Sequence, residues 1–148
     1  RVGWLGCTNG TLFSLIEALR YFPFSLQVAL PPLEDRPTLE AYARHCGVKV
    51  DFVDTPQQAV EGCNFVYAGC RSGLDDELAQ QWKVDDALLS HADQKARVLL
   101  GTSPMQAIEV ASDILASPAS LLLLQSENRL RVHKRLLHWV FLENERVI

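Results

Sequence analysis

The 148-residue chain has the length of one ordinary domain, and its 48% hydrophobic and 22% charged residues are typical of a globular protein, not a disordered one. Its formal net charge of -4 disfavours nucleic acid as a partner, because phosphate contacts need a concentrated basic surface. No apolar run is long enough for a membrane span, and the four cysteines and four histidines match no zinc spacing. We therefore expect a cytoplasmic protein with reduced thiols, no metal and no cofactor, and, because the chain begins with Arg1 instead of Met, further sequence upstream.

The start of the chain is typical of a strand, a tight turn and a helix. An apolar run from Val2 enters a turn of glycine and small polar residues, and apolar residues then recur at helical spacing, at Leu12, Leu15, Ile16 and Leu19. In an open parallel sheet such a turn bounds the ligand crevice, into which its unpaired N–H groups point. We therefore expect residues 7–11 to form part of the floor of a site.

The glycines of this turn do not predict dinucleotide binding. Gly3, Gly6 and Gly10 lack the GxGxxG spacing, and the second predicted strand ends in Val-Ala-Leu-Pro instead of an acidic residue. A tight connection between strand and helix explains them better.

The rest of the chain alternates between strands and helices. Strands are predicted at 25–30, 49–53, 64–67, 97–100 and 120–124. Helices are predicted at 37–46, 56–61, 77–90 with a break near residues 82 and 83, 104–115 and 128–144. This alternation predicts a three-layer α/β sandwich with a mostly parallel, doubly wound, Rossmann-like sheet, formed by residues 1–148 as a single domain.

Two short runs carry a resemblance to a known family. Residues 6–18 parallel Gly-Asp-Gly-Asn-Asn…Asn-Ser-Leu-Ile-Glu-Ala, and residues 126–130 contain Glu-Asn-Arg; residues 58–67 and 110–124 also fit. Because these runs occur in the same order and at the same spacing as in the family, nearly the whole chain resembles the second, amino-acid-binding domain of the aspartate/ornithine carbamoyltransferases. The resemblance is closer to the ornithine enzymes. The resemblance implies a transferase of arginine metabolism that takes carbamoyl from carbamoyl phosphate. The family's carbamoyl-phosphate domain is absent from this sequence.

At the substrate positions the resemblance is incomplete. Asn9 remains, but Gly10 replaces the asparagine that meets ornithine in the family. The family's aspartate after the fourth strand, which holds the amino group of the substrate, falls near Ala68 or Gly69. Arg129 matches a residue that contacts carbamoyl phosphate in the family.

Two further loops of the family's site are altered here. Its Ser-Met-Gly loop is reduced to Ser72-Gly73, and its His-Cys-Leu-Pro turn becomes Gly-Thr-Ser-Pro at residues 101–104. The resemblance therefore implies no catalytic residue, and its substrate-binding candidates are Asn9, Ser72, Thr102, Ser103 and Arg129.

The missing acid has a physical consequence for amino-acid binding. A free amino acid needs an anion facing its ammonium group, because a buried unpaired ammonium costs several kcal/mol. Asp75, Asp76 and Glu77 follow the altered loop, but acids before a helix more commonly form a favourable first turn. We therefore expect the isolated chain not to carbamoylate ornithine or aspartate.

Phosphate, sulfate or a carboxylate is a second class of ligand. The hydroxyls of Thr102 and Ser103 at a helix start, together with Arg129, form a possible anion site. The alternative, which we weigh somewhat higher, is that Ser103 only caps its helix and Arg129 pairs with Glu127 or another acid.

The basic, amphipathic final helix is typical of either a membrane surface or a protein contact. We favour a contact, in which one face packs on the sheet and another on the missing domain or another chain. Trp139, Phe141 and Leu142 should then be exposed, and a homo-oligomer is possible. Cys7 and Cys70 should lie close together if their strands are neighbours.

Three functions remain open from the sequence. The leading one is a carbamoyltransferase-like amino-acid-binding domain that is inactive alone. The others are part of an active carbamoyltransferase with a different amine substrate, and a non-catalytic binding or scaffold module.

Overall fold

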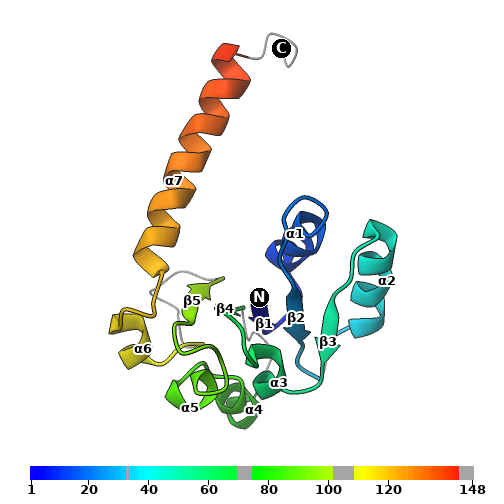
Figure 1. The fold of residues 1–148 in the computed structure, drawn as a ribbon, viewed down its shortest axis with the longest axis vertical. Coiled ribbons are helices and arrows are strands. Elements are labelled where there is room, and N and C mark those ends of the chain that lie inside the picture. Colours follow the sequence, from blue (N-terminus) through cyan, green and yellow to red (C-terminus); the bar gives the residue numbers. More distant parts are fainter. Residues whose placement is uncertain (33, 70–74, 102–108, 144–148) are drawn as a thin grey trace.

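The structure is built around a five-stranded parallel sheet. It is a computed structural model that describes residues 1–32, 34–69, 75–101 and 109–143. The strand order is β3-β2-β1-β4-β5, and the strands are β1 (Val2–Leu5), β2 (Leu26–Ala29), β3 (Asp51–Val53), β4 (Phe65–Ala68) and β5 (Arg97–Leu100) (Figure 1). Leu5 at the end of β1 lies opposite Ala29 of β2 and Ala68 of β4. The expected α/β class and parallel sheet are confirmed.

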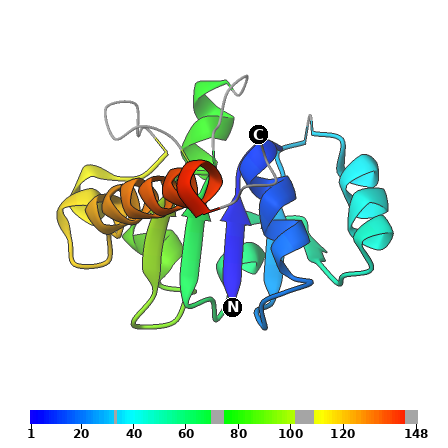
Figure 2. The same ribbon diagram turned by 90° about the horizontal axis from the view of Figure 1, so that it is seen from above.

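One face of the sheet is covered by α1 (Gly10–Ala18) and α2 (Arg36–Cys46), and α7 (Leu122–His138) starts over the same face beside β5 (Figure 2). Because successive strand residues point to opposite faces, Trp4 belongs to this side and Leu5 to the other. The buried core here includes Trp4, Leu12, Ile16, Val28 and Leu39.

The other face is covered by shorter helices, α3 (Pro56–Val60), α4 (Asp76–Gln81), α5 (Asp86–Leu89) and α6 (Ser112–Ala116). They bury a second core that includes Leu5, Val60, Val66, Trp82 and Val98. The predicted break between α4 and α5 is confirmed, since Val84 between them forms a parallel bridge with Val110. Two cores on opposite faces of one sheet make the three-layer sandwich.

Helix ends follow the sequence signals. Asp35 caps α2 by accepting a hydrogen bond from the Thr38 N–H at 3.1 Å, and Gly47 ends that helix in the left-handed conformation at φ 69°. Thr55 and Gln58 form the predicted capping box of α3, each side chain accepting from the backbone of the other. These caps fix the connections on both sides of β3.

The C-terminal helix extends away from the body of the molecule (Figure 1). It continues from α7 into a π-helical stretch, η2 (Trp139–Glu143), and none of the residues of α7 is buried. Its exposed large apolar side chains are Leu123, Leu124, Leu130, Val132, Leu136, Leu137, Trp139, Phe141 and Leu142. The expected exposure of Trp139, Phe141 and Leu142 is thus confirmed. No helix within the described ranges combines the length and apolar composition needed to cross a bilayer.

Three expected elements near the C-terminus differ from the structure in whole or in part. Residues 120–124 do not form a strand: Ser120 makes only an isolated bridge to Val98, and α7 already begins at Leu122, not at residue 128. The helix expected over 104–115 is wrong at 109–111, because Val110 pairs with Val84; only Ser112–Ala116 is helical, and residues 102–108 lie outside the described part. Backbone pairing with the sheet layer, which periodicity does not reveal, decides these boundaries.

Candidate functional site

The turn between β1 and α1 holds the first predicted site residue. Asn9 caps α1, and its side-chain oxygen accepts hydrogen bonds from the N–H groups of Thr11 at 2.9 Å and Leu12 at 3.2 Å. That oxygen therefore serves the helix, and the amide nitrogen is the part of the side chain left for a ligand. Gly10, at the position of the family's second asparagine, is exposed and has open space around its Cα.

A carboxylate that the sequence analysis did not single out also reaches this turn. Glu34, in the connection from β2 to α2, accepts a hydrogen bond from the Thr8 N–H at 2.7 Å. The Thr8 hydroxyl oxygen is buried and has no hydrogen-bond partner among the described residues. Glu34 could have been found from the sequence only by considering acidic residues several positions beyond the second strand as well as the residue that ends it.

Tyr67 links the elements around the carboxyl end of β4. Its ring stacks on Trp4 with the centroids 4.7 Å apart, and the side chains of Thr11 in α1 and Gln125 in α7 lie near enough to affect its hydroxyl. Burial raises the pKa of Tyr67, while the polar side chains of Thr11 and Gln125 and the positive charge of Arg129 act in the opposite direction. Tyr67 therefore lies between the β1–α1 turn and the final helix.

Arg129 is exposed on α7, within electrostatic range of Tyr67. The expected alternative, in which Arg129 pairs with Glu127, is wrong: Glu127 pairs with Arg131, one helical turn away, at 2.5 Å. Among the described residues no carboxylate forms an ion pair with Arg129. Its guanidinium is therefore available to an anion approaching from the side of Tyr67.

No side chain fits at the carboxyl end of β4. The Gly69 N–H donates to the Leu5 carbonyl at 2.6 Å, and a Cβ added to Gly69 would lie 2.8 Å from Cζ2 of Trp4 and 2.9 Å from that carbonyl oxygen. Ala68, one residue earlier, is only 2% exposed. The two positions near which the resemblance places the family's aspartate are thus closely packed, and the Trp4 ring lies against Gly69.

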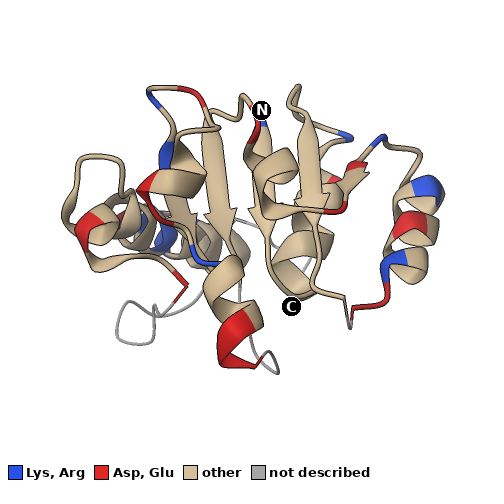
Figure 3. Ribbon diagram, turned by 90° about the horizontal axis from the view of Figure 1, so that it is seen from below, with Lys and Arg blue, Asp and Glu red and all other residues tan. Residues whose placement is uncertain are grey.

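The three acids after the altered loop act at the start of α4. Asp75 is the N-cap, its carboxylate accepting from the Leu78 N–H at 2.8 Å, and Asp76 and Glu77 lie in the first turn (Figure 3). The structure confirms the expected capping role of Asp75. All three residues are exposed.

The structure therefore places two of the five predicted site residues. Asn9 caps α1 through the N–H of Thr11, and Arg129 lies on α7, within electrostatic range of Tyr67. Ser72, Thr102 and Ser103 lie outside the described residues, as does Cys70, although β1 and β4 are neighbours as the Cys7–Cys70 hypothesis required. Tyr67, Gln125 and Glu34 are the contributors that the sequence analysis missed. In the described ranges, no cluster of three or more His, Cys, Asp or Glu side chains could hold a metal ion.

Comparison with known proteins connects this geometry to one family. Residues 1–140 match the family model described as "Aspartate/ornithine carbamoyltransferase, Asp/Orn binding domain". Two ornithine carbamoyltransferases are similar in sequence: that of Nitratidesulfovibrio vulgaris is 32% identical over 97% of this chain, and that of Oleidesulfovibrio alaskensis is 34% identical over 95%. The chain covers 51% and 50% of these two proteins, so it spans about half the length of the relatives it matches.

Solved structures agree on the fold. The mitochondrial ornithine carbamoyltransferase of Coccidioides immitis superposes with a TM-score of 0.83 at 20% identity, over 99% of this chain and 49% of that one. The ornithine carbamoyltransferase of Burkholderia thailandensis superposes with a TM-score of 0.78 at 28% identity, over 95% of this chain and 47% of that one. In both, the matched part is again about half of the larger protein.

Proposed function

Because the chain belongs to the aspartate/ornithine carbamoyltransferase family and matches its Asp/Orn-binding domain, we propose that it is the amino-acid half of a cytoplasmic carbamoyltransferase-like protein and does not transfer carbamoyl by itself. Residues 1–148 form a single domain in this proposal, and the carbamoyl-phosphate half belongs to another part of the protein or to another chain. Carbamoyl transfer relies on positioning and charge stabilisation, and neither is complete in one half of the site.

The packing of Gly69 against Trp4 carries this proposal. An ammonium group entering the site needs a nearby carboxylate, and a Cβ at Gly69 would be 2.8 Å from the Trp4 ring. A carboxylate therefore cannot be restored at this position without displacing a ring that is fully buried and stacked on Tyr67. This argues that binding of the ornithine or aspartate amino group is lost.

The anion-binding part of the site is better preserved. Arg129 has no ion pair with a described carboxylate, and its positive charge acts on Tyr67 of β4. We propose that Asn9 and Arg129, together with Ser72, Thr102 and Ser103 from the two loops, bind a small anion such as phosphate or a substrate carboxylate.

The uncovered C-terminal helix supports the missing half as a partner. Nine large apolar side chains of α7 and η2 are exposed, with Phe141 at 63% and Leu142 at 73%. Apolar surface on this scale marks a contact with another domain or chain. In our proposal the carbamoyl-phosphate half covers it, and two copies of the isolated chain associate through it when that half is absent.

The direct test is a carbamoyl-transfer assay on the purified chain. With millimolar carbamoyl phosphate and either L-ornithine or L-aspartate, we expect no citrulline or carbamoyl-aspartate above the blank. Product formation above the blank would overturn the proposal. A different amine substrate is the second candidate, favoured by the intact Arg129, and product from another amine only after addition of the carbamoyl-phosphate half of a relative would support it.

Anion binding is tested separately by following the amide NMR shifts while phosphate is added. We expect shifts around Thr11 and Tyr67 that disappear in Arg129→Ala. Arg131→Ala is the matched control, because it removes an equal charge from the same helix at a residue already paired with Glu127. No shift at millimolar phosphate, or an equal loss in both variants, would contradict the anion site.

A further inference from the structure

One cavity lies at the carboxyl ends of β2 and β3. Its volume is about 670 Å³, within the range of small-molecule sites. Glu34 is the one described residue of the candidate site that also lines it: the cavity lies between the ends of β2 and β3, the start of α3, and α4. In an open parallel sheet, this edge is where ligands bind.

Part of the cavity wall is apolar. Phe52 of β3, with the Arg36 guanidinium carbon 5.7 Å from its ring centroid, and Trp82 after α4 contribute aromatic rings, and three prolines, Pro31, Pro32 and Pro56, contribute rigid pyrrolidine faces. Trp82 is only 5% exposed, so its position is fixed by the core. Rings and prolines in this arrangement suit a planar, aromatic ligand body.

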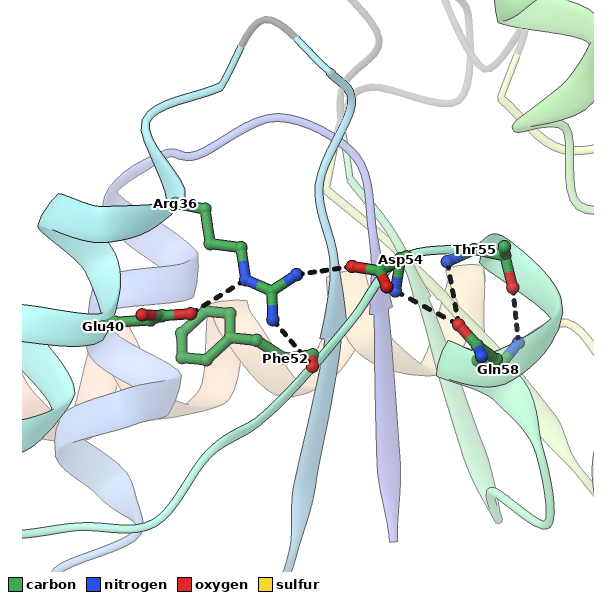
Figure 4. A network of polar contacts seen from close by, with 6 residues as sticks. All are labelled: Arg36, Glu40, Phe52, Asp54, Thr55 and Gln58. Carbon is green, nitrogen blue, oxygen red and sulfur yellow. Dashed lines mark hydrogen bonds and ion pairs between the residues drawn. The ribbon is translucent and has the colours of Figure 1, made fainter.

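Among the described lining residues, Arg36 is the charged donor, and three of its five N–H groups are already used. Its guanidinium donates to the Glu40 carboxylate at 2.8 Å, to the Asp54 carboxylate at 2.7 Å and to the Phe52 carbonyl at 3.0 Å (Figure 4). Two carboxylates therefore balance one guanidinium. This network holds the start of α2 against the end of β3 and gives the cavity a rigid side.

The remaining polar lining combines carboxylate acceptors with the side chains of Thr55, Gln57 and Gln81, which can both donate and accept. Pro31, Pro32 and Pro56 have no N–H to donate, and Glu34 and Asp54 supply carboxylate oxygens. Beside the cavity, α4 opens with an acidic first turn (Figure 3). A ligand that carries phosphate or carboxylate would meet like charge here, whereas one that carries amino and hydroxyl donors would find partners.

Glu34 also occupies a phosphate-binding position of this kind of fold. In dinucleotide-binding sheets the turn after β1 offers its N–H groups to a pyrophosphate. Here the Thr8 N–H of that turn donates to the Glu34 carboxylate at 2.7 Å instead. The protein's own carboxylate therefore takes the place of the anion, and a ligand at the ends of β2 and β3 has no phosphate site to extend into.

We propose that this cavity binds a nucleobase or nucleoside that carries no phosphate. The planar ring lies among Phe52, Trp82 and the prolines, and the exocyclic amine and sugar hydroxyls donate to Glu34 and Asp54. Because one oxygen of Glu34 holds the Thr8 N–H, occupancy of the cavity is transmitted to the β1–α1 turn. The proposal goes beyond carbamoyl transfer and does not rest on it.

The test uses the 148-residue chain, adenosine and adenosine 5′-monophosphate, with amide and indole NMR shifts as the readout. We expect adenosine to shift the resonances of Phe52, Asp54, the Trp82 indole and, through Glu34, the Thr8 amide. The monophosphate should bind at least tenfold more weakly. Glu34→Gln keeps an oxygen for the Thr8 N–H but removes the charge, and it should weaken adenosine binding and reduce the preference over the monophosphate.

Two variants of α4 distinguish binding in the cavity from a nonspecific effect of adding a tryptophan to this helix. Gln81 of α4 lines the cavity, whereas its exposed neighbour Gln80 does not. Gln81→Trp should therefore fill the opening and abolish the shifts, and Gln80→Trp should leave them unchanged. Absence of shifts at millimolar adenosine in the unmodified chain overturns the proposal, as does equal or tighter binding of the monophosphate, or equal effects of the two tryptophan variants.

Discussion

The side chain of Gln125 in α7 makes two hydrogen bonds with the backbone of Leu100 at the end of β5. The Leu100 N–H donates to Oε1 of Gln125 at 3.1 Å, and Nε2 of Gln125 donates to the Leu100 carbonyl at 2.8 Å. Just before α7, the Leu121 N–H donates to the Val98 carbonyl at 2.9 Å. The backbone at the edge of β5 therefore pairs with the backbone of Leu121 and with the side-chain amide of Gln125. These hydrogen bonds hold the first turn of α7 on the sheet.

We expect Gln125→Ala to reduce the free energy of unfolding by about 1–3 kcal/mol, because both polar backbone groups of Leu100 lose their partner at a buried strand end. Urea denaturation measures the change. Gln80→Ala, on the exposed face of α4, is the control and should change the stability by less than about 0.5 kcal/mol. Equal effects of the two substitutions would refute the anchoring role of Gln125.

Gly3 and Gly10 provide a second matched pair. A Cβ at Gly3 would lie 2.3 Å from the Ala59 carbonyl oxygen and 3.2 Å from the Cys63 sulfur, whereas a Cβ at Gly10 meets nothing within 4 Å. We expect Gly3→Ala to destabilise by about 2–3 kcal/mol through overpacking between β1 and α3. Gly10→Ala, at the first position of α1, should be neutral or stabilise by up to about 1 kcal/mol. Thermal unfolding of the two variants compares them, and a tolerated Gly3→Ala would show that α3 can move away from β1.

The contact between α1 and α2 should be pH-dependent. The Tyr42 hydroxyl donates to the Glu17 carboxylate, and this hydrogen bond is the main cause that raises the pKa of Tyr42 to about 12. Because the folded-state pKa lies above the unfolded value of about 10, the stabilisation is complete below pH 10 and is lost as the pH rises to 12. The difference in unfolding free energy between the native chain and Tyr42→Phe should therefore shrink across this window.

Absorbance of the phenolate offers an independent check on Tyr42. In Glu17→Gln the titration midpoint of this tyrosine should fall toward pH 10, because its carboxylate acceptor is gone. Subtracting the titration of Tyr42→Phe isolates its signal from the other two tyrosines. A midpoint that does not respond to Glu17→Gln would mean that another group holds the phenol proton.

Cys63 should resist alkylation in the folded protein. It is fully buried, and burial raises its thiol pKa to about 11. At pH 8 its thiolate fraction is then about a hundredfold below that of an ordinary thiol, and the reagent has no access to the sulfur. Half-buried Cys46 is the internal comparison. Peptide mass spectrometry after iodoacetamide treatment should show modification at Cys46 and none at Cys63 until urea unfolds the chain.

Local sequence signals were enough to predict the helices and strands in the first two thirds of the chain. The caps at Asp35 and Thr55 and the left-handed Gly47 specify their helix ends through contacts within a few residues. Alternation of these helices with apolar strands then restricts the sheet to a parallel one. The signals failed near Val110 and Ser120, where bridges to Val84 and Val98 override the helical and apolar patterns. Such pairings join distant residues, and periodicity contains no information about them.

The candidate site was predictable only where a motif survived. Asn9 and Arg129 were found because they occupy recognisable runs. Tyr67, Gln125 and Glu34 were missed, because each becomes relevant through a contact with an element far away in the chain. The close packing at Gly69 was equally hidden, since it depends on the Trp4 ring of a neighbouring strand.

The position of β1 in the sheet affects how the chain folds during synthesis. β1 is the first of these five strands to be made, yet it lies in the middle of the sheet, between β2 and β4. Pairing with β2 closes a short loop, and pairing with β4 costs roughly 1 kcal/mol more in chain entropy because that loop is longer. Until β4 leaves the ribosome, one edge of β1 therefore remains unpaired, with the apolar side chains of Trp4 and Leu5 uncovered on that side. An unpaired apolar strand edge is a template for pairing with another nascent copy, so the interval between the synthesis of β2 and β4 is when this chain is most prone to aggregate.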